Sequence, residues 1–92
     1  MGASRSFILP KRHVHNIVDI QFDHTGDYLA SCALDGTVAV YALSLQCYTH
    51  AFEIDQTPSC MGWVLTKTDF LSLVVGCANG DLHQIIFMQG NV

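Results

Sequence analysis

Two copies of one strand-turn-strand pattern fill most of this chain, and this repeat is the strongest constraint on its fold. Residues 29–38 (LASCALDGTV) match residues 73–82 (LVVGCANGDL) at a distance of 44 positions. Residues 20–22 match residues 61–63 at a distance of 41 positions, so a three-residue difference falls between the matching segments. Length differences of this kind belong in surface turns. The sequence therefore predicts a repeat protein in which one supersecondary unit occurs twice.

Each copy contains an Asx-Gly pair, Asp35-Gly36 in the first and Asn79-Gly80 in the second. A two-residue hairpin turn of type I′ needs positive φ at both central residues, which Asn, Asp and Gly adopt at the lowest cost. The pairs are therefore the predicted turns of two β-hairpins. Runs rich in apolar and β-branched residues flank both turns and predict strands over residues 28–34, 37–43, 71–77 and 81–88.

The segment before the first hairpin also has strand character. Over residues 17–23, apolar Ile20 and Phe22 alternate with polar neighbours, which predicts a half-buried strand followed by a turn. Residues 46–54 predict a further strand that links the two copies. No segment shows a sustained helical period or a helix-starting cap, so we expect an all-β chain of antiparallel meanders.

The hairpin strands are apolar on both faces. Ala30, Cys32 and Leu34 alternate with Leu29 and Ala33, so neither face of this strand is polar. Such a strand needs cover above and below, and the hairpin turns require antiparallel pairing, so other sheets must supply the cover. Radially stacked four-stranded sheets, the blades of a β-propeller, meet this need, and a repeat of about 44 residues has the length of one blade.

Residues 29–41 (LASCALDGTVAVY) resemble the second strand, tight turn and third strand of a WD40 repeat. His13 stands ahead of the first strand, where the WD40 family has a Gly-His pair, although Arg12 replaces the Gly. The resemblance is specific over residues 12–43 and weaker over residues 46–88. It implies an incomplete WD40-like β-propeller of about two antiparallel four-stranded meander blades.

The implied partial propeller has fewer blades than the roughly four to eight of a closed one. Its two outermost sheets would expose apolar faces, and a chain that is 50% hydrophobic and 13% charged has few charges to cover them. We therefore expect self-association through the exposed blade faces, or a protein partner that supplies further blades. The implied single domain spans residues 1–92, with blade one over residues 14–54, blade two over residues 58–88, and residues 6–9 left over as an outer strand of a preceding blade.

In WD40 repeats a His, a Ser or Thr, an Asp and a Trp form a hydrogen-bonded network. The resemblance assigns this structural tetrad to His13, Ser31, Asp35 and Tyr41. Tyr41 stands in the Trp position, and its hydroxyl can donate a hydrogen bond as an indole N–H does. Val75 and Ile85 occupy the Ser and Trp positions of the second copy, which we expect to be held by packing alone.

The family resemblance implies a scaffold for protein–protein interaction without catalytic activity. We expect no catalytic residues and no cofactor, since the Ser, Cys and His residues form no known catalytic motif. His13 and His15 share one side of an extended segment, but the further ligands that a zinc site needs are not identifiable. Candidate residues of a binding rim are the polar turn residues His24, Thr25, Lys67, Thr68, Asp69, Asp55, Gln56 and Thr57.

Charge and cysteine content exclude other classes. Four Lys and Arg residues against eight Asp and Glu residues give a formal net charge of -4, which excludes a nucleic-acid groove. The chain has no apolar run of the ~18 residues that span a bilayer and no secretory signal, so the expected location is intracellular, cytoplasmic or nuclear. The four cysteines form no close pair, which predicts buried free thiols at Cys32, Cys47, Cys60 and Cys77.

An alternative function starts from the first six residues, MGASRS, which fit the pattern for N-myristoylation. Gly2 is the candidate lipidation site, and Arg5, Lys11 and Arg12 follow it as an electrostatic second signal. The alternative is therefore an N-myristoylated peripheral membrane adaptor, for which a membrane is a partner only if Gly2 is acylated.

Overall fold

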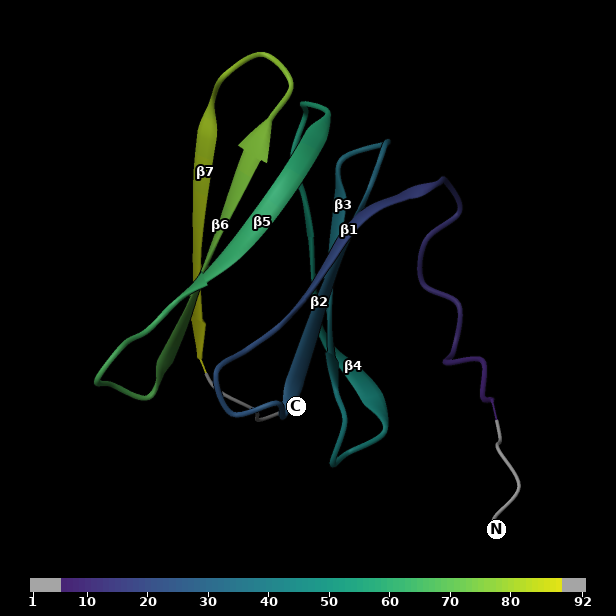
Figure 1. Cartoon of the computed structure of the whole chain (residues 1–92), viewed down its shortest axis with the longest axis vertical. Coiled ribbons are helices and arrows are strands. Elements are labelled where there is room, and N and C mark those ends of the chain that lie inside the picture. The colour runs from purple at the N-terminus through teal and green to yellow at the C-terminus, as the bar shows by residue number, and fades with distance from the viewer. Residues whose placement is uncertain (1–5, 89–92) are drawn as a thin grey trace, which may run out of the picture.

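The computed structural model describes residues 6–88, which form seven strands in two antiparallel sheets (Figure 1). No helix occurs among these residues, and hence none that could cross a membrane. The all-β prediction and the antiparallel meanders are confirmed. Sheet 1 contains, in spatial order, β1 (Ile17–Phe22), β2 (Tyr28–Ala33), β3 (Thr37–Ala42) and β4 (Cys47–Glu53). Sheet 2 contains β5 (Pro58–Val64), β6 (Phe70–Cys77) and β7 (Leu82–Met88).

The two sheets repeat one another in their hydrogen bonding. The N–H of Leu34 donates to the Asn16 carbonyl at 3.0 Å, and 44 positions later the N–H of Ala78 donates to the Thr57 carbonyl at 2.9 Å. The first strand of each sheet carries a register shift at the same place, and the strand pairing that follows it is equivalent in both sheets. The repeat in the sequence is therefore a repeat in the backbone.

Both hairpins turn at their Asx-Gly pair, but the predicted type I′ turn is wrong. Only the glycines have positive φ, at 90° for Gly36 and 95° for Gly80. Each loop has one residue more than the two of a type I′ hairpin turn. The Gly36 N–H donates to the Ala33 carbonyl at 3.0 Å, and the Gly80 N–H donates to the Cys77 carbonyl at 3.0 Å. A three-residue loop favours a type I turn followed by a glycine with positive φ, which matches both connections.

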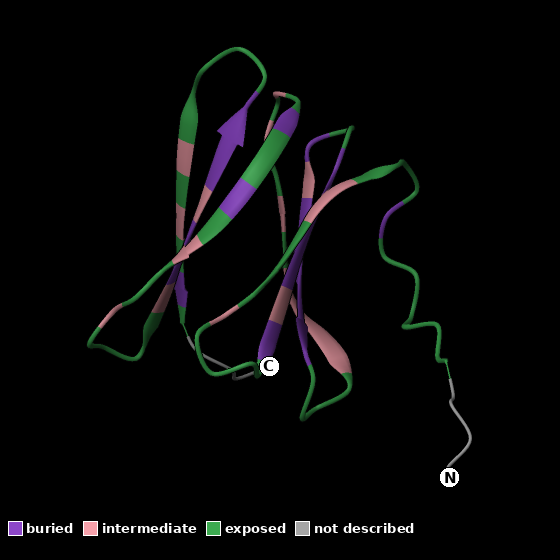
Figure 2. Ribbon diagram, in the orientation of Figure 1, coloured by how far each residue is buried: buried purple, intermediate pink, exposed green. Residues whose placement is uncertain are grey.

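The central strands of sheet 1 are buried on both faces (Figure 2). One of these faces, which we call the inner face of sheet 1, packs against the inner face of sheet 2, and apolar side chains fill the space between them. The buried core consists of Tyr28, Ala30, Cys32, Val38, Val40 and Ala42 from sheet 1 and Met61, Leu73, Val75, Cys77 and Phe87 from sheet 2.

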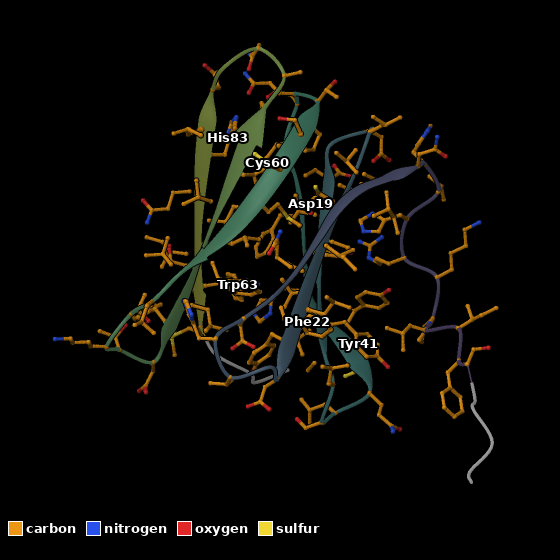
Figure 3. All side chains as sticks on the ribbon, viewed as in Figure 1. Asp19, Phe22, Tyr41, Cys60, Trp63 and His83 are labelled. Carbon is orange, nitrogen blue, oxygen red and sulfur yellow. The ribbon has the colours of Figure 1, made fainter. Side chains whose placement is uncertain are left out.

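Hydrogen bonds join the first strands of the two sheets, β1 and β5, which lie side by side (Figure 3). The Asp19 carboxylate accepts the backbone N–H of Met61 at 2.8 Å. The indole N–H of Trp63 donates to the Gln21 carbonyl at 2.9 Å. These bonds satisfy polar groups of β1 and β5 at the edge of an otherwise apolar interface, and they set the position of one sheet along the other.

The N-terminal strap, residues 6–16, lies over the other face of sheet 1, which we call its outer face. The Tyr48 hydroxyl donates to the Pro10 carbonyl at 2.7 Å, and Ile8 and Leu9 line a cavity of about 370 Å³ together with Leu29 of the sheet. The expected strand over residues 6–9 is not formed, because these residues pair with no strand, and the side chains of Phe7 and Ile8 are 79% and 99% exposed.

The cysteines differ in burial, although all four are free. Cys32 and Cys77 are buried as predicted, Cys47 is half-buried, and Cys60 is exposed. The prediction for Cys60 is wrong because β5 is an edge strand, and Cys60 lies on the face of sheet 2 that is turned away from the core.

The surroundings of the glycines predict different responses to substitution. Gly36 and Gly26 both have positive φ, so an alanine at either position costs about 1–2 kcal/mol in backbone strain. A Cβ atom on Gly36 would also collide with the Ile54 carbonyl, whereas a Cβ atom on Gly26 meets nothing within 4 Å. Gly36→Ala should therefore lower the free energy of unfolding by about 1–3 kcal/mol more than Gly26→Ala. Equal losses in urea denaturation would contradict this backbone contact.

Candidate functional site

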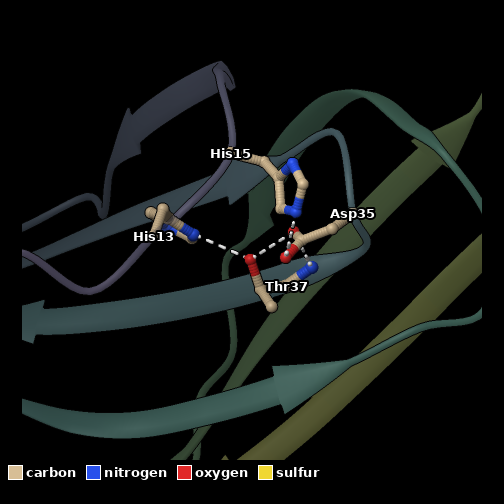
Figure 4. A network of polar contacts seen from close by, with 4 residues as sticks. All are labelled: His13, His15, Asp35 and Thr37. Carbon is tan, nitrogen blue, oxygen red and sulfur yellow. Dashed lines mark hydrogen bonds and ion pairs between the residues drawn. The ribbon is translucent and has the colours of Figure 1, made fainter.

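A chain of hydrogen bonds ties the N-terminal strap to sheet 1 (Figure 4). The strap residue His13 is buried against sheet 1, and its Nε2 atom lies 2.7 Å from Ser31 Oγ. On the opposite side of the ring, Nδ1 lies 2.8 Å from Thr37 Oγ1. The Thr37 hydroxyl in turn donates to the Asp35 carboxylate at 2.7 Å. We call these four residues the strap network.

The hydrogen bonds of the strap network define the protonation of His13. The Thr37 hydroxyl donates its proton to the Asp35 carboxylate. Its oxygen therefore accepts a hydrogen bond from Nδ1–H of His13. A neutral His13 then accepts the Ser31 hydroxyl proton at Nε2, and every member of the network is satisfied.

Burial and charge act on the titration of this network. Burial lowers the pKa of His13 below its ordinary value, against a smaller opposing effect of the Asp35 charge and with a small contribution from Arg12. The hydrogen bond from the Thr37 hydroxyl lowers the pKa of Asp35. The network therefore favours the neutral form of the His13 imidazole and the ionised form of the Asp35 carboxyl group.

The structure brings three members of the expected tetrad together and leaves one out. His13 bonds directly to Ser31, and Asp35 joins them through Thr37. Tyr41 is buried, but its ring packs edge-on against Tyr48 at a centroid distance of 5.0 Å and makes no hydrogen bond to the network within residues 6–88.

Thr37 is the member that the sequence interpretation missed. A signal for it exists in the triplet Asp35-Gly36-Thr37, because an Asx residue accepts the backbone N–H of the residue two positions later. The Thr37 N–H donates to Asp35 at 3.1 Å, and a hydroxyl at that residue reaches the same carboxylate. In the second copy Asp81 stands in this place, and its N–H donates to Asn79 at 3.0 Å.

The strap network is suited to holding the chain rather than to chemistry. Its order of Ser, His and acid resembles a catalytic triad, but the Thr37 hydroxyl separates the carboxylate from the ring that it would have to support. Among residues 6–88 no group of three or more His, Cys, Asp or Glu residues is placed to hold a metal ion. The Nε2 atom of His15 lies 4.0 Å from the Asp35 carboxylate at the exposed end of the network.

The candidate rim residues lie at two opposite ends of the molecule. His24, Thr25 and Thr68 line a cavity of about 140 Å³ between the β1–β2 and β5–β6 turns, and Lys67 and Asp69 are exposed in the latter turn. The β4–β5 connection, which holds Asp55, Gln56 and Thr57, lies at the other end of the strands. There Gln56 donates to Asp81 at 2.6 Å and contacts Nε2 of His83 at 2.7 Å. The rim is therefore not one continuous surface.

Large apolar side chains are exposed on the outer faces of both sheets. On the outer face of sheet 1, Phe22 is 57% exposed and Ile20 is 52% exposed. On the outer face of sheet 2, Leu82 is 76% exposed and Ile86 is 61% exposed. The strand register adds Ile17 and Leu29 to the first face and Val64, Phe70 and Met88 to the second.

No family model, no curated protein and no solved structure matches this chain. The candidate lipidation site Gly2 lies outside the described residues. The function is therefore inferred from the side chains and contacts of residues 6–88.

Removal of one hydroxyl should weaken the strap network. Thr37→Val keeps the shape of the side chain but leaves the Nδ1–H of His13 without its acceptor. An unsatisfied buried donor costs about 1–3 kcal/mol, so the free energy of unfolding should fall by that amount. Thr37→Ser is the matched control, because it keeps the hydroxyl. Equal stability of the Val and Ser variants in urea denaturation would contradict the network.

The lowered pKa of His13 predicts how stability depends on pH. The unfolded chain binds more protons than the folded chain below the ordinary pKa of 6.5, so the free energy of unfolding should fall as the pH drops from there through the folded-state pKa. Burial lowers the pKa of His50 as well, and its contribution has the same sign. An NMR titration should give a pKa below 6.5 for His13. A value above 6.5, or a stability that rises on acidification in this range, would contradict the assignment.

Proposed function

We propose that this chain is a non-catalytic scaffold for protein–protein interaction, built as two blades of a WD40-like β-propeller. The observation that carries the proposal is the pair of exposed apolar outer faces, one on each sheet. Contiguous exposed apolar surface is uncommon on monomeric proteins and marks interaction sites. Here the two surfaces lie on opposite sides of the molecule, and the strap covers only part of the outer face of sheet 1.

The backbone repeat supports the propeller interpretation. Each sheet is a meander with the same register shift, the same loop bonds and the same glycine turn. The strap network adds support, because it ties the segment before the first strand to the second and third strands, as the tetrad of the WD40 family does. The fourth member of the network is Thr37 rather than Tyr41, and the second copy has Val75 in the place of Ser31.

The outer faces of the two sheets are well suited to burial in a protein partner. Their exposed residues are Val, Leu, Ile, Phe and Met, each of which gains about 1.5–3 kcal/mol when it is fully removed from water. A scaffold that binds through such faces needs neither a cofactor nor a metal. The polar turns would then serve solubility and turn formation.

Site-specific photo-crosslinking tests this function. A photoreactive phenylalanine analogue placed at Phe22 reports on the outer face of sheet 1, and one placed at Leu82 reports on the outer face of sheet 2. The matched control is Leu65, which is also 72% exposed but lies in the β5–β6 turn near the candidate rim.

Both face positions should give discrete protein adducts in cells, at several times the yield of the control. Stronger adducts at Leu65 would move the interaction site to the turns. The lack of adducts of any mass at Phe22 and Leu82 would contradict the proposed function.

A further inference from the structure

The repeat relates the outer face of sheet 2 to the inner face of sheet 1. A residue of sheet 1 and the residue 44 positions later occupy equivalent places in β2 and β6, or in β3 and β7. The inner-face residues of sheet 1 are the ones that pack on sheet 2. Ala30, Cys32, Val38 and Ala42 correspond in this way to Val74, Gly76, Leu82 and Ile86 on the outer face of sheet 2.

The converse relation holds for the outer face of sheet 1. The inner face of sheet 2 includes Met61, Trp63 and Leu73, which receive the inner face of sheet 1. Their equivalents at distances of 41 and 44 positions are Ile20, Phe22 and Leu29. The exposed face of each sheet is thus equivalent to a face that takes part in the packing between the sheets.

We infer that a second copy of this chain covers these faces, with the outer face of sheet 2 in one copy packed on the outer face of sheet 1 in the next. The inference rests on the proposed function and names its partner. The contact is head to tail, because two different surfaces meet, and it repeats between copies the packing that already joins the two sheets within one chain.

The free edge of sheet 2 supports the same arrangement. In sheet 1 the fourth strand β4 pairs with β3, whereas β7 has no further strand beside it among residues 6–88. Residues 6–9 lie 41 positions before residues 47–50 of β4, so the strap of the second copy is the segment equivalent to the missing strand. An exposed strand edge accepts such a segment by strand addition.

The two glycine turns mark where that strap would pass. Gly36 lies against the backbone of Ile54, the residue after β4, and the Ile54 N–H donates to the Gly36 carbonyl at 2.9 Å. The equivalent glycine, Gly80, has nothing within 4 Å of the Cβ position. His13 is the repeat equivalent of Ile54, because the two residues are 41 positions apart. The backbone at His13 of the second copy would therefore fill the space beside Gly80, while the His13 side chain stays bonded to Ser31 of the second copy.

The polar side chains that the strands place on the outer faces have hydrogen-bond partners within the same copy, and Lys11, Arg12 and His15 of the strap border the outer face of sheet 1. On sheet 2, the Gln84 amide donates to the Ser72 hydroxyl at 2.9 Å, so the two polar side chains satisfy each other. On sheet 1, Ser31 is bonded to His13. The bonds that Asp19 and Trp63 make between the sheets have no equivalent, because Cys60 and Phe22 stand in their places. The contact between copies is therefore formed mainly by apolar strand residues and should depend on protein concentration.

A pair of complementary variants tests the proposal. Ile86→Glu places a charge on the outer face of sheet 2, and Ile20→Glu places one on the outer face of sheet 1. Every head-to-tail contact uses both faces, so either variant alone should be monomeric, with an apparent Kd raised more than about tenfold by the buried charge. An equimolar mixture retains one intact pair of faces and should form a one-to-one heterodimer.

Sedimentation velocity on the purified chains reads out the assembly state, and circular dichroism checks that each variant keeps its β structure. The native chain should form oligomers of about two to four copies, which supply the roughly four to eight blades of a closed propeller. Leu65→Glu is the matched control, because it adds the same charge to an exposed turn residue, and it should assemble as the native chain does.

Three results would overturn the proposal: a native chain that stays monomeric at high concentration, a face variant that assembles alone as the native chain does, or a mixture that remains two monomers. Assembly of one face variant alone would indicate a two-fold symmetric contact through the other face. A monomeric native chain that still gives photo-adducts with other proteins at Phe22 and Leu82 would overturn only the second copy as partner and would leave the proposed function in place.

Discussion

Apolar packing between the inner faces of the two sheets is the interaction on which the rest of the structure depends. Meanders of three or four strands need another layer against their apolar face to be stable in water. Val38 and Val40 on one side and Leu73 and Val75 on the other are fully buried in this contact. The short connection between β4 and β5 and the bond from Met61 to Asp19 hold the two faces in one alignment.

Burial of one face of sheet 1 leaves a second apolar face that also needs cover, and the N-terminal strap supplies part of it. The strap is held by few contacts, chiefly the bond from Tyr48 to Pro10 and the strap network around His13. This explains why a short irregular segment contains a buried, neutral histidine. The strap leaves Ile20 and Phe22 exposed, so the cover remains partial, as does that of sheet 2.

The positions of six of the seven strands follow from local signals such as the Asx-Gly pairs and the alternation around Ile20 and Phe22, and only the match of residues 20–22 to residues 61–63 indicates β5. The turn type does not follow, since the length of each loop depends on strand register. The hydrogen-bond role of Thr37 in place of Tyr41 depends on side-chain reach in three dimensions. Residues 6–9 have the composition of a strand, but strand formation needs a neighbouring edge, which no local pattern encodes.

The packing of one sheet on the other can be observed most directly through the ring of Phe87. This ring lies 4.5 Å from His50 and 5.4 Å from Phe52 across the two sheets, measured between ring centroids. It also lies 6.0 Å from Trp63 within sheet 2, which provides an internal reference. NMR should show nuclear Overhauser effects from Phe87 to both His50 and Phe52 at native pH. Effects to Trp63 alone would show that the sheets do not pack through these faces and would contradict the account.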